Sequence, residues 1–199
     1  MIDLITKEHL AKTIRILSVP PIMVSIFILI LAFDKNNIFR NSTEIMIVIA
    51  LLGFVPALAY VLSGLVPKVK AQGREGQRKL AFITNLVGYS IALLWAVFTN
   101  VNRELLLICL TYFISVVLLT ICNKGFHFRA SGHASGFTAP LVFLVYFLGW
   151  KVIIPALIIA VLIVWASVYL KRHTIKELAG GILVNILAFI FSVIIITVL

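Results

Sequence analysis

Two short segments of the chain carry residues that could bind an anion and supply a base or a nucleophile. The first, residues 124–136, contains Ser131, Gly132 and His133 just before an apolar run. Ser131 is a favourable helix N-cap, so Gly132 and His133 are expected in a first helical turn, where free N–H groups and the helix dipole favour an anion. Arg129 adds a planar guanidinium suited to phosphate oxygens. The segment predicts a phosphate cradle, although a capped turn with a polar histidine has the same pattern.

The second segment, residues 165–181, combines a histidine with a carboxylate. His173 and Glu177 are four residues apart, which puts them on one face if a helix runs through both. A carboxylate bonded to one imidazole nitrogen fixes the tautomer and leaves the other nitrogen free as a base or nucleophile. Lys171 and Arg172 share the same turn, and such close like charges repel unless headgroups or a bound anion compensate them.

Membrane-spanning helices are the elements that must position these segments. Hydrophobic residues make up 62% of the 199-residue chain and charged residues 12%, against about 45–50% and 25% in soluble domains, and the mean hydropathy is +1.17. We therefore expect one integral membrane domain over residues 1–199, an all-α polytopic bundle of six to seven spans. The runs long enough to cross about 30 Å of hydrocarbon lie near 16–33, 44–66, 80–99, 104–122, 152–170 and 178–199, with a shorter one near 134–150.

Alternation of seven spans sorts the loops onto two faces of the membrane. About 40 residues separate His133 from His173, which is the length of a helical hairpin that returns both to one interface. That face would hold 13 of the 17 cations, and the other face Lys35, Arg40, Arg103 and Lys151. The positive-inside rule then predicts a cytoplasmic active face in the cell membrane. The net charge of +10 suggests lipid headgroups or an anionic substrate as partners, not nucleic acid.

Taken together, the two segments resemble the type 2 phosphatidic acid phosphatase superfamily of membrane lipid phosphatases, over roughly residues 124–185. The usual signature is Lys-x6-Arg-Pro, then Pro-Ser-Gly-His, then Ser-Arg-x5-His-x3-Asp. Here the second part reads Ala130-Ser131-Gly132-His133. The third part reads Ala166-Ser167-x5-His173-x3-Glu177. The order and spacing of the two parts carry the resemblance.

The chain also departs from that signature. Ser167 stands where arginine is expected, Glu177 replaces aspartate, and no Lys-x6-Arg-Pro string is present. The nearest substitutes are Arg74 and Arg78, which serve equally well as charges that orient the protein, and Lys124 and Arg129 ahead of Ser131. We interpret the chain as a divergent branch with redistributed phosphate-binding cations.

The resemblance implies a metal-independent phosphohistidine mechanism without a cofactor. His173 would attack phosphorus, Glu177 would orient it, and His133 would act as acid and then as base. The substrate would be a lipid phosphomonoester of the phosphatidic acid type or an isoprenoid diphosphate. The residues expected to bind its phosphate are Arg74, Arg78, Lys124, Arg129, Ser131, Gly132, Lys171 and Arg172. A related phosphotransferase, and a catalytically inactive phospholipid-binding or transport protein, are the alternatives.

Overall fold

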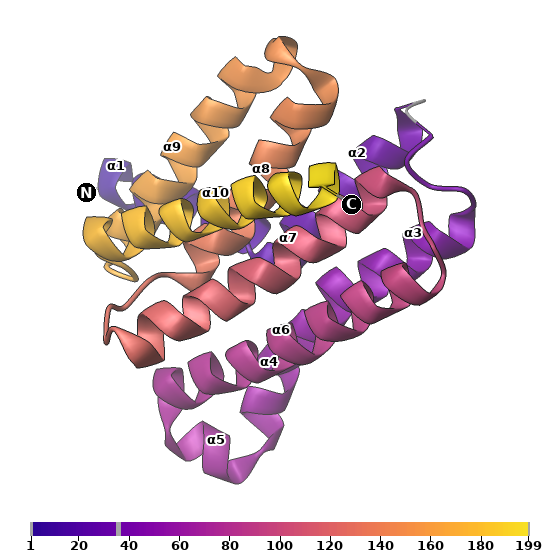
Figure 1. Ribbon diagram of the computed structural model, residues 1–199. Helices are drawn as coiled ribbons and strands as arrows, with labels where there is room; N and C mark the ends of the chain where they lie inside the picture. The colour runs from indigo at the N-terminus through magenta and orange to yellow at the C-terminus, as the bar shows by residue number, and fades with distance from the viewer. Residues whose placement is uncertain (1, 35–36, 199) are drawn as a thin grey trace.

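The protein folds as a bundle of α-helices, with no β-strand in the part of the chain that the structure describes (Figure 1). The computed structural model describes residues 2–34 and 37–198, so Lys35, one of the cations assigned to the opposite face, lies outside the described residues. The principal helices are α1 (Ile2–Leu17), α2 (Pro20–Phe33), α3 (Ser42–Val48), α4 (Val55–Leu65), α5 (Pro67–Ala71), α6 (Gly73–Phe98), α7 (Arg103–Thr120), α8 (Gly132–Leu148), α9 (Ile153–Tyr169) and α10 (Ile175–Val198). Short π-helical turns, η1 (Ile49–Phe54) and η2 (Ile121–Gly125), and a 3-10 turn, η3 (Trp150–Val152), extend them.

The predicted all-α polytopic bundle is confirmed. Five helical segments of 20–26 residues are long and apolar enough to cross a membrane, and α1 and α2 together would make a sixth. The predicted short run is α8, which has 17 residues. The count reaches seven only if α2 and α8 are each taken as a span. By length and composition, the chain is a multi-pass membrane protein.

The first expected span, residues 16–33, is broken near its start. α1 ends at Leu17, α2 begins at Pro20, and the two helices meet at a bend of 62°. Pro20 has no N–H to donate to the preceding turn and its ring would clash with a carbonyl there, whereas proline suits the first position of a new helix. α1 therefore leaves the line of α2 and packs against α9.

Helix packing gives the bundle two distinct ends. The turns at 17–20, 121–131 and 170–174 and the first part of α6 line one cavity, and we call this the site end. At the opposite end, called the far end, the side-chain amide of Asn102 donates to the carbonyl of Asn37 at 2.8 Å and joins the α2–α3 and α6–α7 connections.

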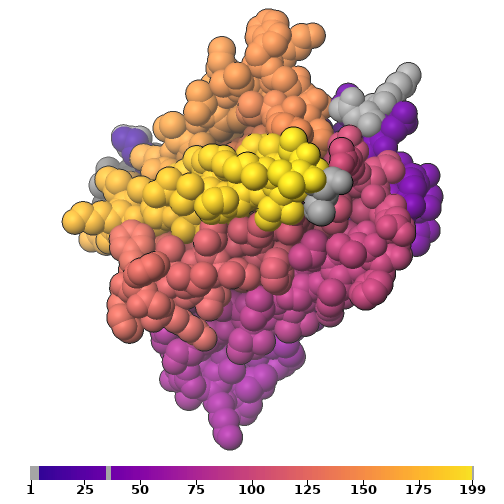
Figure 2. Space-filling model, in the orientation of Figure 1, coloured from indigo at the N-terminus to yellow at the C-terminus, as the bar shows by residue number. Residues whose placement is uncertain are grey.

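The largest apolar core lies toward the far end. Its fully buried large side chains include Phe27, Leu31, Leu105 and Phe143. α10 packs on both α7 and α8, and in Figure 2 it forms a band between α7 and the α8–α9 hairpin. Large apolar side chains exposed along α6, α9 and α10 provide the surface that a lipid-embedded bundle requires.

Candidate active site

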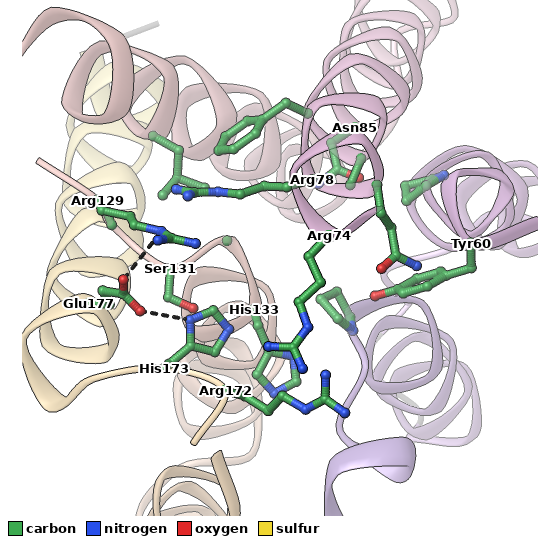
Figure 3. Close-up of a pocket in the computed structure, with 18 of the residues that line it drawn as sticks. Tyr60, Arg74, Arg78, Asn85, Arg129, Ser131, His133, Arg172, His173 and Glu177 are labelled. Atoms are coloured by element: carbon green, nitrogen blue, oxygen red, sulfur yellow. Dashed lines mark hydrogen bonds and ion pairs between the residues drawn. The ribbon is translucent and has the colours of Figure 1, made fainter. Parts of the chain in front are cut away.

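A cavity of about 220 Å³ opens at the site end and collects most of the chemically active residues (Figure 3). Nine of the eleven residues predicted from the sequence line it, namely Arg74, Arg78, Arg129, Ser131, Gly132, His133, Arg172, His173 and Glu177. Lys124 instead lines a neighbouring open pocket with Lys79 and His127. Lys171 is exposed in a left-handed backbone conformation, φ 51°, and does not line the cavity.

His173 and Glu177 form the contact expected of them, but not through a shared helical face. His173 precedes α10, and Nδ1 of its ring lies 3.1 Å from Oε2 of Glu177. Thr174 and Glu177 bond reciprocally, each side chain accepting from the other's backbone N–H at 3.2 Å. This is a capping box, which holds a glutamate at the third helical position close to the residues before the helix. The far nitrogen of His173, Nε2, is left for chemistry.

Ser131 is the N-cap of α8, as the sequence predicts. Its hydroxyl accepts from the backbone N–H of Ala134 at 3.2 Å, and its own N–H donates to the carbonyl of Glu177 at 2.9 Å. The second bond joins the two predicted segments directly. A Cβ at Gly181 would overlap the Ser131 carbonyl oxygen, so only glycine lets α10 approach this turn so closely. Gly132, by contrast, has open space where a Cβ would lie.

His133 lies next to His173 in the same cavity. The two rings are nearly parallel, with centroids 6.2 Å apart and an interplanar angle of 5°. Nε2 of His133 is 3.5 Å from the hydroxyl oxygen of Ser18, and its ring packs edge-on against Phe137. The hydroxyl of Ser18 donates to the carbonyl of Arg15 at 3.2 Å, so a lone pair of its oxygen faces His133. Ser18, Phe137 and His173 therefore surround the imidazole of His133.

The cavity carries a large excess of positive charge. Guanidinium groups of Arg15, Arg74, Arg78, Arg129 and Arg172 line it together with one carboxylate, that of Glu177. Arg129 Nε lies 3.3 Å from Glu177 Oε1, and Arg78 donates to the side-chain oxygen of Asn123. Such a site binds anions through forked, charge-assisted hydrogen bonds.

The same environment favours the neutral form of both imidazoles. Burial, then the charge of Arg15, lowers the pKa of His133, which stands at the first turn of α8 before the apolar run. Burial also lowers the pKa of His173, although its hydrogen bond to Glu177 acts in the opposite direction. A neutral His173 has an unprotonated Nε2, as a nucleophile requires.

The cavity also involves residues that the sequence analysis does not assign to the site. Arg15 lines the cavity, Ser18 lies beside it against His133, and Tyr60, Gln77 and Asn85 also line it. A signal did exist for the first two. Arg15 and Ser18 continue the spacing of Ala11 and Ile14, so all four share one face of a helical turn. Tyr60 lies on a long apolar segment where nothing in the sequence marks it.

The departure at Ser167 has a clear structural setting. Ser167 is fully buried in α9, and its backbone carbonyl accepts from the N–H of Arg172 at 3.0 Å. Its hydroxyl has no hydrogen-bond partner among the described residues. The position is therefore an interior one, and cations reach the cavity from other elements.

No protein-family model, curated protein or solved structure matches this chain. Within residues 2–34 and 37–198, no group of three or more His, Cys, Asp or Glu side chains is arranged to hold a metal ion. The chemistry of the cavity itself is thus the basis for a functional assignment.

Proposed function

We propose that the protein is a membrane lipid phosphatase, similar to the type 2 phosphatidic acid phosphatases, that works through a phosphohistidine intermediate. The observation that carries the proposal is the pair of parallel imidazoles within a ring of guanidinium groups, one of them bonded to a carboxylate through Nδ1. A nucleophile, a second proton-transfer group and an anion-binding shell are what phosphoryl transfer demands.

In the first step, Nε2 of His173 attacks phosphorus and the bond from phosphorus to the lipid oxygen breaks. Glu177 accepts the hydrogen bond from Nδ1 and stabilises the positive charge that develops on the ring. His133 gives its proton to the departing lipid oxygen. The binding of an anionic headgroup offsets the charge of Arg15, so it favours the protonated form of His133 that this step needs.

In the second step, water hydrolyses the phosphohistidine. His133, now neutral, takes a proton from the attacking water, the N–P bond of His173 breaks, and inorganic phosphate leaves. Arg129, Arg172, the Ser131 hydroxyl and the Gly132 N–H neutralise charge on the phosphate oxygens, and Arg74 and Arg78 extend this shell. The lipid tail stays between the helices of the bundle.

Phosphate release by the purified protein tests the proposal. The substrates are phosphatidic acid, phosphatidylglycerophosphate and prenyl diphosphates, and His173→Ala is the matched control. We expect release by the wild-type protein in the presence of chelator, inhibition by vanadate, and an acid-labile phosphoenzyme that His173→Ala lacks. Transfer to an added alcohol instead of water would favour the phosphotransferase. Binding without any turnover would favour the inactive lipid-binding or transport protein.

We further propose that the active face is cytoplasmic and that the protein lies in the cell membrane. The bias of cations toward the site end supports this orientation. Single cysteines at Gln72 and Lys151, in a Cys122→Ser background, can be probed on intact cells with an impermeant thiol reagent. Labelling at Lys151 but not at Gln72 is expected, and the reverse pattern would overturn the orientation.

A further inference from the structure

The end of α1 packs into the site end with one face of the helix. Ala11 is fully buried on that face, Ile14 packs against the apolar cluster around Ala134, and Ser18 is buried where the helix stops. Arg15 follows Ile14 on the same face and lines the cavity. Lys12 lies outside this face and is exposed to solvent, where it pairs with Glu8 at 2.7 Å. Arg15 and Lys12 thus stand in different environments.

The guanidinium of Arg15 is incompletely bonded. Its Nη1 atom is buried and has no hydrogen-bond partner among the described residues. Arg172, Tyr60 and Arg74 lie close enough to act on its charge, and two of these three groups are cations. Glu177, the carboxylate that lines the cavity, is engaged by His173 and Arg129. A buried charged donor without a partner is costly.

An anion in the cavity would satisfy this donor. Arg15 lines the same cavity as His133 and His173 and is close enough to act on the charge of both rings. The turn that carries it is fixed from two sides, because the Ser18 hydroxyl bonds to the Arg15 carbonyl and faces His133. The Arg15 side chain therefore extends from a fixed turn into the cavity that contains both histidines.

We propose that Arg15 is a phosphate-binding residue of the active site, so that the interfacial helix α1 forms part of that site. The guanidinium group of Arg15 would bind an oxygen of the phosphoryl group beside the two histidines. The inference rests on the proposed function for the identity of the lipid substrate. The anion-binding role itself is tested separately with inorganic phosphate.

The test compares Arg15→Gln with Lys12→Gln, which removes a cation from the same helix on its exposed face. Binding of inorganic phosphate is measured by calorimetry in a phosphate-free detergent, and kcat and KM are measured with phosphatidic acid. We expect Arg15→Gln to weaken phosphate binding and to lower kcat/KM at least tenfold, and Lys12→Gln to stay within twofold of wild type. Arg15→Lys, which keeps the charge but not the fork, should fall between them and serves if Arg15→Gln does not fold.

The outcomes separate the two proposals. Equal behaviour of the Arg15 and Lys12 variants in a protein that releases phosphate would overturn the role of Arg15 and leave the phosphatase intact. Phosphate binding that depends on Arg15 in a protein without turnover would support the anion site and overturn the phosphatase. A wild-type protein that does not bind phosphate at all would overturn the role of Arg15.

Discussion

Two arginine–glutamate pairs at opposite ends of the bundle have the same chemistry and differ in how much of their bonding capacity is used. At the far end, Arg40 Nε bonds to Oε1 of Glu44 at 2.5 Å. Its two remaining nitrogens donate to the carbonyls of Asn100 and Thr99, each at 3.2 Å. The Glu44 side chain is only 4% exposed. All the side-chain nitrogens of Arg40 are therefore hydrogen-bonded, and the pair links the α2–α3 connection to the α6–α7 connection.

At the site end, the pair of Arg129 and Glu177 is open. The two side chains meet at 3.3 Å through Nε of the arginine, whose side chain is 65% exposed, and the carboxylate is shared with His173. The terminal nitrogens of Arg129 are thus available to a ligand. A saturated pair holds structure together, whereas an unsaturated pair within a cationic cavity is suited to binding and catalysis.

Glu177→Gln should produce the largest effect, a loss of kcat of roughly 10²-fold or more, because an amide neither fixes the tautomer of His173 nor stabilises its positive charge. The free energy of unfolding should barely change, since glutamine serves in a capping box as well as glutamate does. Steady-state kinetics and thermal unfolding of the same preparation measure the two effects. Loss of stability without loss of turnover would make this pair structural, like that of the far end.

The pH profile of the same variant gives a second readout. The hydrogen bond and charge of Glu177 raise the pKa of His173 against the effect of burial. Without them that pKa falls further, so the nucleophile stays neutral to lower pH. The acid limb of kcat/KM should therefore move to lower pH in Glu177→Gln. A limb that moves to higher pH would show that a different group titrates.

Gly181→Ala should separate the geometry of the site end from its ion pair. The added methyl would overlap the carbonyl of Ser131 and force α10 away from α8, at a cost of about 1–3 kcal/mol in unfolding free energy. Gly132→Ala is the matched control, because its methyl meets nothing within 4 Å and only intrudes on the cavity. We expect it to fold normally and to lose activity several-fold. Equal stability of the two variants would contradict this account.

Glu44→Gln should lower the stability of the protein and leave its turnover nearly unchanged, which is the reverse of Glu177→Gln. We expect a loss of about 1–2 kcal/mol in unfolding free energy, since a charged, largely buried acceptor is weakened while Arg40 stays partly in solvent. Turnover should remain within twofold of wild type, because neither residue lines the cavity. A large fall in kcat in a stable Glu44→Gln protein would mean that the far end takes part in catalysis.

Ionic strength should have the smallest effect on the kinetics, and it should act only on the cationic cavity of the site end. Raising salt from 0.1 M to 1 M shortens the Debye length from about 10 Å to about 3 Å. KM for an anionic lipid should rise several-fold as the guanidinium groups of the cavity are screened, with kcat nearly constant. Kinetics in mixed micelles of a neutral detergent measure this, and a salt-independent KM would count against headgroup capture by the cavity.

Much of this arrangement could be predicted from local sequence patterns. Apolar runs predict the helices, and their alternation predicts that the turns around His133 and His173 share one end. Ser131 as an N-cap is a strictly local property, and it is confirmed. The contact of His173 with Glu177 is likewise confirmed, although a capping box and not a continuous helix produces it.

The remaining site residues depend on packing that no local pattern encodes. Arg15 lines the cavity because α1 ends before Pro20 and packs against α9. This contact joins segments about 150 residues apart in the sequence. Lys171 adopts a left-handed backbone conformation, is exposed and does not line the cavity, which its nearness in sequence to His173 does not show. Lys124 belongs to the π-helical turn η2 and lines the neighbouring pocket.

The short length of two helices has a consequence for the depth of the cavity. α2 and α8 have 14 and 17 residues, about 21 and 26 Å at 1.5 Å per residue, and both begin at the cavity, at Pro20 and Gly132. Along α6, the lining runs from Arg74 to Asn85, a distance of about 16 Å. Because α6 is long and apolar enough to cross a membrane, we expect the cavity to extend into the bilayer, charged near Arg74 and Arg78 and less polar near Ala81 and Phe82. A lipid of the proposed class could present its phosphate without leaving the leaflet. This avoids the work of extracting its chains into water, about 0.8 kcal/mol for each methylene.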